Sequence, residues 1–364
     1  MKPVSPQQTS HTWNIFQDTE SVLESIYSDL KESKESIYIE AFILNHDAVG
    51  ERFLELLTQK ASEGVQVRIL VDSIGSLALG NSLYMQKFKT SGVHIRFFNW
   101  LLPFSKHNKK LWYFRNHRRI ILIDKKTLYT GGFCFGKRME KWRDTSIRIE
   151  GPITEQAAQV AEKTWKKVYK KRYVNLGREW RTNVDNFSFV TQAPLPGERF
   201  LYHSFIDAIK QAKSYVYITT PYFLPDHKLY RVLRQARKRG VQVKILVPER
   251  SDHRIVDHGS HTYYHTFLSK KMEIYQYPRM IHAKTAVIDD EWSMIGTLNM
   301  DNISLRYNFE CAIVSTNSDC AKELRTMHER DLAESKKVTL EAWENRSFLE
   351  KCKDMLVWPI RKLL

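Results

Sequence analysis

Apolar and polar positions along this chain follow helical and extended patterns in the same order twice. Apolar residues at helical spacing predict four helices, over residues 19–32, 50–63, 198–213 and 229–239. Runs rich in β-branched and aromatic residues predict a strand beside each helix, over residues 36–44, 64–71, 215–224 and 240–247. Strands that alternate with helices favour an α/β fold, in which helices cover the faces of a sheet.

The second half of the chain repeats the first in its residues as well as in its pattern. The sequence GVQVRILV at residues 64–71 returns as GVQVKILV at residues 240–247. Two short apolar runs, residues 120–123 and 285–288, each end at an aspartate and suit strands that are buried on both faces. We therefore predict two similar αβ halves, each with a mixed central sheet flanked by helices, packed about a pseudo-two-fold axis.

The repeat and the local composition divide the chain into four predicted parts. Residues 1–12 are polar and rich in Pro, Ser and Gln, so we expect a flexible tail there. The two halves are predicted at residues 13–180 and 181–345, because a polar stretch separates the repeated patterns. Residues 346–364 mix apolar and basic side chains around Pro359, which is the composition of an amphipathic segment that contacts a membrane. A last helix docked on the core is the alternative.

Composition and charge narrow the class of protein. Hydrophobic residues make up 42% and aromatic residues 12% of the 364 residues, which is enough for a sizeable core. No apolar run is long enough to span a bilayer. The four cysteines have neither a metal-binding nor a disulfide spacing, which fits a reducing compartment. The net charge of +16 favours a polyanionic partner, either nucleic acid or an anionic membrane leaflet.

A histidine motif occurs once in each half. His117 and Arg119 stand at alternate positions, as do His282 and Lys284, so each pair points to one side of an extended segment. Two such pairs facing each other form a pocket with two imidazoles and two cations, which suits a phosphodiester. One imidazole can attack phosphorus and hold it covalently while the other protonates the leaving alcohol. Because the cations neutralise the phosphate oxygens, we expect neither a metal nor another cofactor.

Four carboxylates are expected to support this motif. Asp144 and Glu310 follow the two histidines at nearly equal spacing, and we predict that they orient the imidazoles by accepting a ring N–H. Asp124 and Asp289 belong to the catalytic motif and end the two buried strands. We assign them to holding the turn more than to proton transfer.

The doubled pattern His-x-Lys-x4-Asp with a Gly-led turn, present with variations, resembles the phospholipase D superfamily. The segments NHR at 116–118, WRD at 142–144, TTPYFLPD at 219–226 and NFE at 308–310 resemble bacterial cardiolipin synthases, most closely members without N-terminal transmembrane helices. The resemblance covers nearly the whole chain. It implies that a phosphatidyl group passes from one phosphatidylglycerol to another through a phosphatidyl-histidine, giving cardiolipin and glycerol.

The resemblance also implies roles and a location. The histidine of the first half is the expected nucleophile, and that of the second half the general acid and base. The expected partners are an anionic phospholipid and a membrane surface rather than nucleic acid, and the expected location is peripheral, on the cytoplasmic face of the cell membrane. The implied phosphate-binding residues are Arg119, Lys284, Thr297, Asn299 and Cys134.

Two of these positions depart from the family pattern, and both lie in the first half. Arg119 stands where the family has Lys, which keeps the charge on a larger fork. Cys134 stands where the family has Asn, and a thiol is a weak hydrogen-bond donor, so one phosphate contact is weakened or lost. Drift in a working enzyme and a partly relaxed first half are both open interpretations.

Two alternatives to a synthase follow from the same residues. With water as the acceptor, the protein is a hydrolase of the phospholipase D or nuclease type. With a relaxed first motif, it is a pseudoenzyme that binds lipid. The sequence does not indicate an oligomeric state.

Two further segments are ambiguous. Residues 97–114 form an apolar and basic insert before the first motif, for which contact with lipid and simple packing are alternatives. His258, His261 and His265 share one helical face, but no acidic or thiol residue in the pattern completes a metal site. We therefore predict a substrate-facing helix rather than a metal centre.

Overall fold

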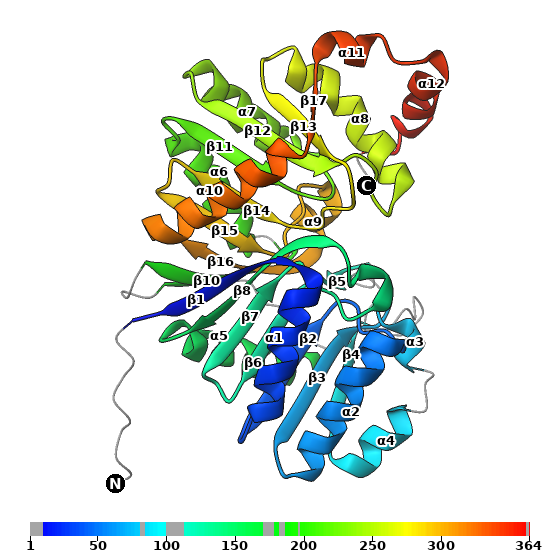
Figure 1. Ribbon diagram of the computed structural model, residues 1–364, viewed down its shortest axis with the longest axis vertical. Coiled ribbons are helices and arrows are strands. Elements are labelled where there is room, and N and C mark those ends of the chain that lie inside the picture. Colours follow the sequence, from blue (N-terminus) through cyan, green and yellow to red (C-terminus); the bar gives the residue numbers. More distant parts are fainter. Residues whose placement is uncertain are drawn as a thin grey trace.

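The chain forms two mixed sheets with helices on their faces, one sheet from each half (Figure 1). This computed structural model describes residues 10–80, 84–99, 113–169, 178–181, 186–195, 197–361 and 364. The predicted tail at residues 1–12 lies mostly outside the described residues. The other predicted boundaries between parts of the chain stay predictions.

The first sheet has seven strands in the order β1-β8-β7-β6-β2-β3-β4. Its strands, with the short β5 that leaves it, are β1 (Thr12–Asp18), β2 (Ser36–Ala41), β3 (Gln66–Asp72), β4 (His94–Phe98), β5 (Arg115–Asn116), β6 (Ile120–Ile123), β7 (Thr127–Gly131) and β8 (Arg143–Glu150). The helices of this half are α1 (Thr19–Glu32), α2 (Ala48–Ser62), α3 (Leu77–Gly80), α4 (Tyr84–Ser91), a 3₁₀ turn at Lys137–Met139, and α5 (Ile153–Tyr169).

The second sheet runs in the order β17-β13-β12-β11-β14-β15-β16-β10-β9. Its strands are β9 (Arg178–Arg181), β10 (Phe187–Gln192), β11 (Tyr215–Thr219), β12 (Gln242–Pro248), β13 (Glu273–Tyr277), β14 (Thr285–Ile288), β15 (Trp292–Gly296), β16 (Asn308–Ser315) and β17 (Lys336–Val338). The helices are α6 (Phe200–Gln211), α7 (His227–Lys238), α8 (Arg254–Leu268), α9 (Asn302–Arg306), α10 (Ser318–Ala333), α11 (Leu340–Glu344) and α12 (Phe348–Val357).

The two sheets share one topology. Read from β4, the first sheet has the order β4-β3-β2-β6-β7-β8-β1, and the second has the matching order β13-β12-β11-β14-β15-β16-β10. In both, the three strands before the histidine motif are parallel to each other, and the later strands are antiparallel. The prediction of two similar halves with mixed sheets is therefore confirmed.

Local signals in the sequence explain the main helices. The helices α1, α2, α6 and α7 agree with the predicted spans to about two residues at each end. Asp18 and Asp226 begin α1 and α7 as N-caps, because their carboxylates accept backbone N–H groups of Ser21 at 2.7 Å and Leu229 at 2.8 Å.

The halves are packed against each other through a shared apolar core. One cluster of buried side chains joins Ile120 and Ile147 of the first sheet to Val287, Phe309 and Ile313 of the second. In addition, β5 of the first half pairs in parallel with β16 of the second. The halves therefore form one body, and the residues at their junction are held from both sides.

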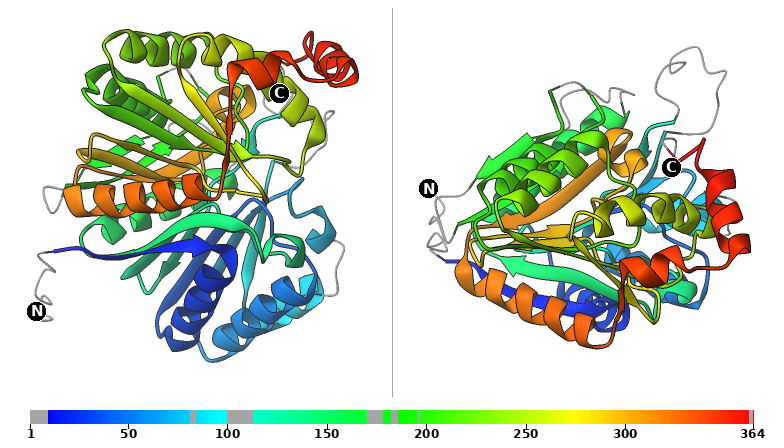
Figure 2. Two further views of the ribbon diagram at one scale, coloured as in Figure 1. Left: turned by 45° about the horizontal axis from the view of Figure 1, so that its top comes forward. Right: turned by 90° about the horizontal axis from the view of Figure 1, so that it is seen from above.

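The C-terminal part of the chain extends beyond the repeat. After α10, β17 pairs with β13 in antiparallel fashion, and α11 and α12 then pack against α8 (Figure 2). Among the described residues, no helix is both long enough and apolar enough to cross a bilayer.

Candidate active site

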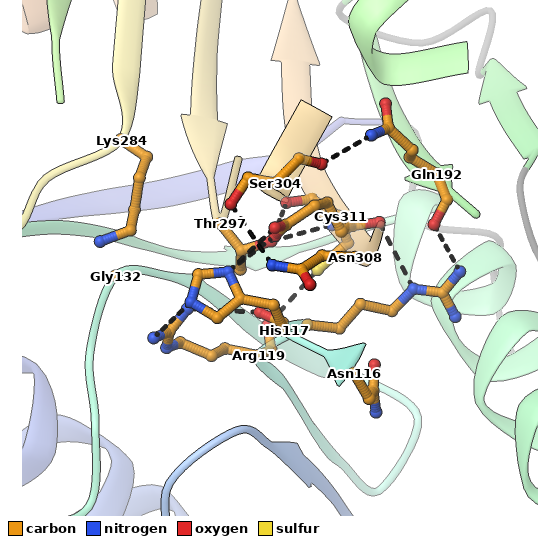
Figure 3. Close-up of polar contacts among 12 residues, drawn as sticks. Asn116, His117, Arg119, Gly132, Gln192, Lys284, Thr297, Ser304, Asn308 and Cys311 are labelled. Atoms are coloured by element: carbon orange, nitrogen blue, oxygen red, sulfur yellow. Dashed lines mark hydrogen bonds and ion pairs between the residues drawn. The ribbon is translucent and has the colours of Figure 1, made fainter. Parts of the chain in front are cut away.

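The two histidine motifs meet where the halves join, and Figure 3 shows the part around His117. His117 follows β5, and His282 precedes β14. The backbone N–H of His117 donates to the carbonyl of Phe309 at 3.0 Å, and that of His282 donates to the carbonyl of Arg143 at 2.7 Å. Each histidine backbone is thus held by the opposite half. Both side chains are buried, so the two imidazoles are shielded from bulk water.

Each imidazole is paired with a carboxylate from the opposite half. Nδ1 of His117 lies 3.0 Å from both carboxylate oxygens of Glu310. Nδ1 of His282 lies 2.9 Å from Oδ2 of Asp144 and 2.9 Å from the carbonyl oxygen of Gly132. A carboxylate at Nδ1 favours the tautomer that carries hydrogen there, so Nε2 keeps its lone pair. The sequence identified both acids, but the crossed pairing appears only in the fold.

Two cations lie beside the imidazoles. Nη2 of Arg119 is 3.4 Å from Nε2 of His117, and its Nη1 donates to the carbonyl of His117 at 3.3 Å. Nζ of Lys284 donates to the carbonyl of His282. Figure 3 shows the guanidinium and the ammonium on the same side of the His117 ring. Both groups are buried, where a positive charge requires nearby negative charge to be stable.

Burial controls the protonation of this cluster. It lowers the pKa of Lys284 to about 7, and Arg119 adds to this effect. Burial, together with the Lys284 charge, lowers the pKa of His282 to about 4. The pKa of His117 is also lowered by burial, although Glu310 opposes the shift. For Asp144 burial acts to raise the pKa, but the nearby cationic groups outweigh it and the pKa lies below its usual value.

The predicted phosphate-binding residues lie around this cluster with different partners. The thiol of Cys134 is buried, and Nη2 of Arg119 lies 3.3 Å from its sulfur. The Thr297 hydroxyl donates to the Glu310 carboxylate, so in this state it supports the acid. Asn299 is buried, and its Oδ1 has no hydrogen-bond partner among the described residues. That these residues contact phosphate stays a prediction.

The two aspartates that end the buried strands hold turns. The Asp124 carboxylate accepts the backbone N–H groups of residues 34, 35 and 36, each at 2.8 Å. The Asp289 carboxylate accepts those of residues 213, 214 and 215, at 2.6, 2.9 and 2.7 Å. Both residues have positive φ, 51° and 55°. These contacts agree with the structural role expected for both, and none of them involves an imidazole.

The buried groups that hold the segment before His117 were not among the residues predicted from the sequence. The Asn116 amide donates to Glu40 at 2.9 Å, and the Asn116 backbone N–H donates to Asp72 at 2.9 Å. The Tyr38 hydroxyl also donates to Glu40, at 2.8 Å. Glu40 and Asp72 are fully buried, and a charged residue inside an otherwise apolar strand is the signal that could have identified them.

The histidines of α8 have a partner that the sequence pattern did not show. Nδ1 of His258 and of His261 lie 2.8 and 3.2 Å from Oδ1 of Asp354, which comes from α12. The other oxygen of Asp354 accepts from Arg346 at 2.8 Å. The statement that no acid joins these histidines is therefore wrong, because the acid lies far away in sequence. The absence of a metal centre stays a prediction.

The insert at residues 97–114 is described only at its two ends. Its central part, residues 100–112, lies outside the described residues. Phe98 and Phe114 at the ends are buried, and both rings pack edge-on against the ring of Phe309. The two alternatives for the insert, lipid contact and simple packing, both stay open.

Comparison with known proteins finds likenesses over most of the chain. A family model described as cardiolipin synthase, PLD-like domain, matches residues 26–167 and 205–332. The chain is 30% identical to a cardiolipin synthase of Clostridium perfringens, over 96% of this chain and 76% of that protein. It is 32% identical to cardiolipin synthase A of Pseudomonas putida, over 89% of this chain and 69% of that protein.

Solved structures share the fold. The crystal structure of phosphatidylserine synthase from Haemophilus influenzae superposes with a TM-score of 0.77 at 13% identity, over 96% of this chain and 93% of that chain. The polyphosphate kinase of Porphyromonas gingivalis gives a TM-score of 0.63 at 10% identity, over 97% of this chain and 53% of that chain. At such identities the likeness concerns the fold alone.

Proposed function

This chain belongs to the family of cardiolipin synthases with phospholipase D-like domains, and we propose that it transfers a phosphatidyl group from one phosphatidylglycerol to another. The observation that carries this proposal is the crossed pair of histidines. Each imidazole has a carboxylate at Nδ1, and two buried cations lie beside them. This arrangement supplies a nucleophile, a general acid and two positive charges for one phosphodiester.

In the first step, Nε2 of His117 attacks phosphorus. A nitrogen–phosphorus bond forms, and the bond between phosphorus and the glycerol oxygen breaks. His282 gives a proton to the departing oxygen, so that glycerol leaves as a neutral alcohol. Arg119 and Lys284 hold the non-bridging oxygens, where negative charge concentrates.

In the second step, the terminal hydroxyl of another phosphatidylglycerol attacks the same phosphorus. His282, now neutral, takes the proton from that hydroxyl, and the bond to His117 breaks. The products are cardiolipin and the free enzyme, so protons balance over the two steps. Glu310 and Asp144 keep both rings in position and stabilise the charge that each ring gains in turn.

Charge balance in the cluster supports this order of events. With neutral imidazoles and a protonated Lys284, the charges of Arg119 and Lys284 cancel those of Asp144 and Glu310. A bound phosphodiester adds one negative charge to a buried site, which favours a proton on an imidazole. Because burial holds the pKa of His282 at about 4 in the unoccupied site, we propose that the negative charge of the bound substrate raises this pKa and so charges the general acid.

The cellular location of the protein is proposed from its substrate and its charge. The substrate is a membrane phospholipid, and the net charge of +16 is attracted to an anionic leaflet. We propose that the protein works as a peripheral protein on the cytoplasmic face of the cell membrane.

One assay tests the proposed function. Purified protein is incubated with phosphatidylglycerol vesicles, and the lipid products are separated. We expect cardiolipin and glycerol in equal amounts, and none from the His117→Ala or His282→Ala variants. Phosphatidic acid as the main product would instead identify a hydrolase, and no turnover with retained vesicle binding would identify a pseudoenzyme.

A further inference from the structure

Exposed large apolar side chains lie mainly on helices found on one side of the molecule in Figure 1. Among the described residues, the exposed large apolar side chains lie in or beside α3, α8, α9 and α12, with two exceptions. One is Tyr113, whose ring contacts that of Tyr307 just after α9. The other is Phe200 at the start of α6, which lies apart from this set. The members are Ile74, Leu77, Tyr113, Ile255, Ile303, Phe348, Leu349, Met355, Leu356, Trp358 and Ile360. We call this set the apolar rim.

The rim is concentrated on α12. Phe348 is 79% exposed and Leu356 is 78% exposed, and Leu349 and Met355 are exposed on the same helix. Figures 1 and 2 show α12 on the outside of the molecule, beyond α8. In Figure 1, α3 of the other half lies on the same side. A helix that exposes this many large apolar side chains marks a candidate interaction surface.

Polar contacts fix which face of α12 points outward. Asp354 is buried beneath the helix, where it receives His258 and His261 on one oxygen and Arg346 on the other. Val357 is the apolar residue buried on the same inner face. Rolling α12 to bury its leucines would break three polar contacts to Asp354 and expose its carboxylate. The outward apolar face is therefore built into the fold.

The rim adjoins the active site from both halves. In the first half, the Asp72 carboxylate accepts the N–H groups of Ile74 and Asn116, each at 2.9 Å, and Asn116 precedes His117. In the second half, Asp301 is the N-cap of α9, close after Asn299 in the chain, and α9 carries Ile303. The N–H of Ile303 donates to the carbonyl of Leu364 at 3.2 Å, so the end of the chain lies there too.

Cations accompany the apolar residues. Lys351 and Lys353 are exposed on α12. The Arg361 guanidinium lies 4.3 Å from the Trp358 ring and 5.6 Å from the Tyr263 ring. Aromatic and aliphatic side chains mixed with lysine and arginine are typical of helices that lie in the surface of an anionic bilayer. The charge of the whole chain, +16, has the same sign.

We propose that the apolar rim seats the protein on an anionic phospholipid bilayer, with α12 lying in the lipid surface and the active site turned toward it. This inference rests on the proposed function in one respect, that the substrate is a membrane phospholipid. It extends the predicted membrane contact of residues 346–364 to a docking face shared by both halves. The bilayer delivers phosphodiesters to the site from the same side on which α3 and α12 lie.

Vesicle flotation tests this proposal independently of turnover. The variant carries Leu349→Ser, Met355→Ser and Leu356→Ser, and the matched control carries Phe200→Ser, an exposed apolar residue outside the rim. Both are made with His117→Ala, so that no reaction alters the vesicles. On vesicles of phosphatidylglycerol and phosphatidylcholine, we expect the triple variant to bind about 100-fold more weakly than its parent. The control should bind as its parent does.

A second arm separates docking from catalysis. With His117 restored, the triple variant should convert detergent-dispersed phosphatidylglycerol at the parental rate and lose activity on vesicles. If dispersed substrate gives no cardiolipin while flotation follows the expected pattern, the proposed function fails and the docking face stands. Vesicle binding equal to that of the parent overturns the docking face. Light scattering that shows the triple variant breaking up an oligomer, with vesicle binding unchanged, assigns the rim to self-association instead.

Discussion

The carboxylate of Glu310 lies 3.0 Å from Nδ1 of His117, although 193 positions separate the two residues in the chain. The symmetric contact joins Asp144 to His282 across 138 positions. Each acid contacts the histidine of the other half. A substitution in one half therefore changes the surroundings of a histidine in the other half. A change in either acid therefore acts on a histidine whose neighbours in sequence are untouched.

The first prediction distinguishes the roles of the two histidines through substitutions of the acids that orient them. Glu310→Gln and Asp144→Asn should each lower kcat on phosphatidylglycerol by about 10²–10⁴-fold, because the amide removes the charge that holds and stabilises the ring. With p-nitrophenyl phosphatidate, whose leaving group needs no proton, Asp144→Asn should lose much less in the burst of p-nitrophenol. Glu310→Gln should keep its full loss, because attack by His117 is still required.

Circular dichroism and thermal melts of both variants serve as controls for folding. The opposite result, in which Glu310→Gln recovers on the activated substrate, would assign the nucleophile to His282. Equal losses on both substrates would contradict the separation of roles altogether.

The second prediction concerns the pair formed by Arg119 and Cys134. Nη2 of Arg119 lies 3.3 Å from the Cys134 sulfur and 3.4 Å from Nε2 of His117. The Arg119 side chain is longer than the Lys of the family pattern, so it reaches the position where that pattern has Asn in place of Cys134. We expect Cys134→Asn alone to change kcat/KM by less than about threefold. Arg119→Lys alone should lower it about tenfold, and the double variant should recover most of that loss.

The measurement is a double-mutant cycle on kcat/KM. A coupling of about 1 kcal/mol is expected for groups in contact. Additive effects would show that the two departures arose independently. A large gain from Cys134→Asn alone would indicate that the first half of this chain is relaxed.

The third prediction follows from the lowered pKa values of Lys284 and His282, about 7 and about 4. At pH 8 both groups are mostly neutral in the unoccupied site, and a bound anion raises both pKa values. Binding of tungstate, a phosphate mimic, should therefore take up protons. Calorimetry in buffers of different ionisation enthalpy measures the number of protons taken up on binding. This number should be clearly smaller for Lys284→Met. Release of protons would contradict the assignment.

The same shift has a consequence for stability. The folded-state pKa of Lys284 lies below its ordinary value of 10.5. Between about pH 7 and pH 10.5 the unfolded chain therefore holds a proton that the folded chain lacks, so the Lys284 contribution rises with pH in this window. Relative to Lys284→Met, the melting temperature of the parent should increase as pH rises from 7 to 9.

The fourth prediction is that Asp289 and Asp124 stabilise the folded protein and take no part in catalysis. Each carboxylate accepts three backbone N–H groups. Asp289→Ala should lower the free energy of unfolding by about 1–3 kcal/mol and leave kcat per folded molecule within about threefold of the parent. Denaturant unfolding and active-site-normalised kinetics measure both effects. A loss of kcat comparable to that of His282→Ala, with normal stability, would return Asp289 to the catalytic machinery.

Much of the fold could be predicted from the sequence because its signals are local or repeated. The helices α1 and α7 have apolar faces and aspartate caps, and GVQVRILV and GVQVKILV mark equivalent strands. The doubled motif likewise identified both histidines and both cations. The nearly equal spacing of Asp144 and Glu310 from the two histidines indicated that the acids form a pair.

The crossed contacts could not be predicted, because spacing along a chain carries no information about which half faces which. The pairing of β5 with β16 brings Glu310 to His117, and nothing local to either segment indicates it. The same limit explains the error about His258 and His261, whose acidic partner Asp354 lies on a helix near the end of the chain. Long-range contacts of this kind depend on the packing of whole elements.

The pairing of β5 with β16 also matters while the protein is being made. A ribosome completes the segment around His117 long before it reaches Phe309 and Glu310, so the first histidine emerges without the backbone and carboxylate partners that hold it. The His117 ring therefore lacks the carboxylate that orients it until Glu310 has been synthesised. Under the proposed function, we therefore expect His117 to become an oriented nucleophile only after the chain has been translated beyond Glu310.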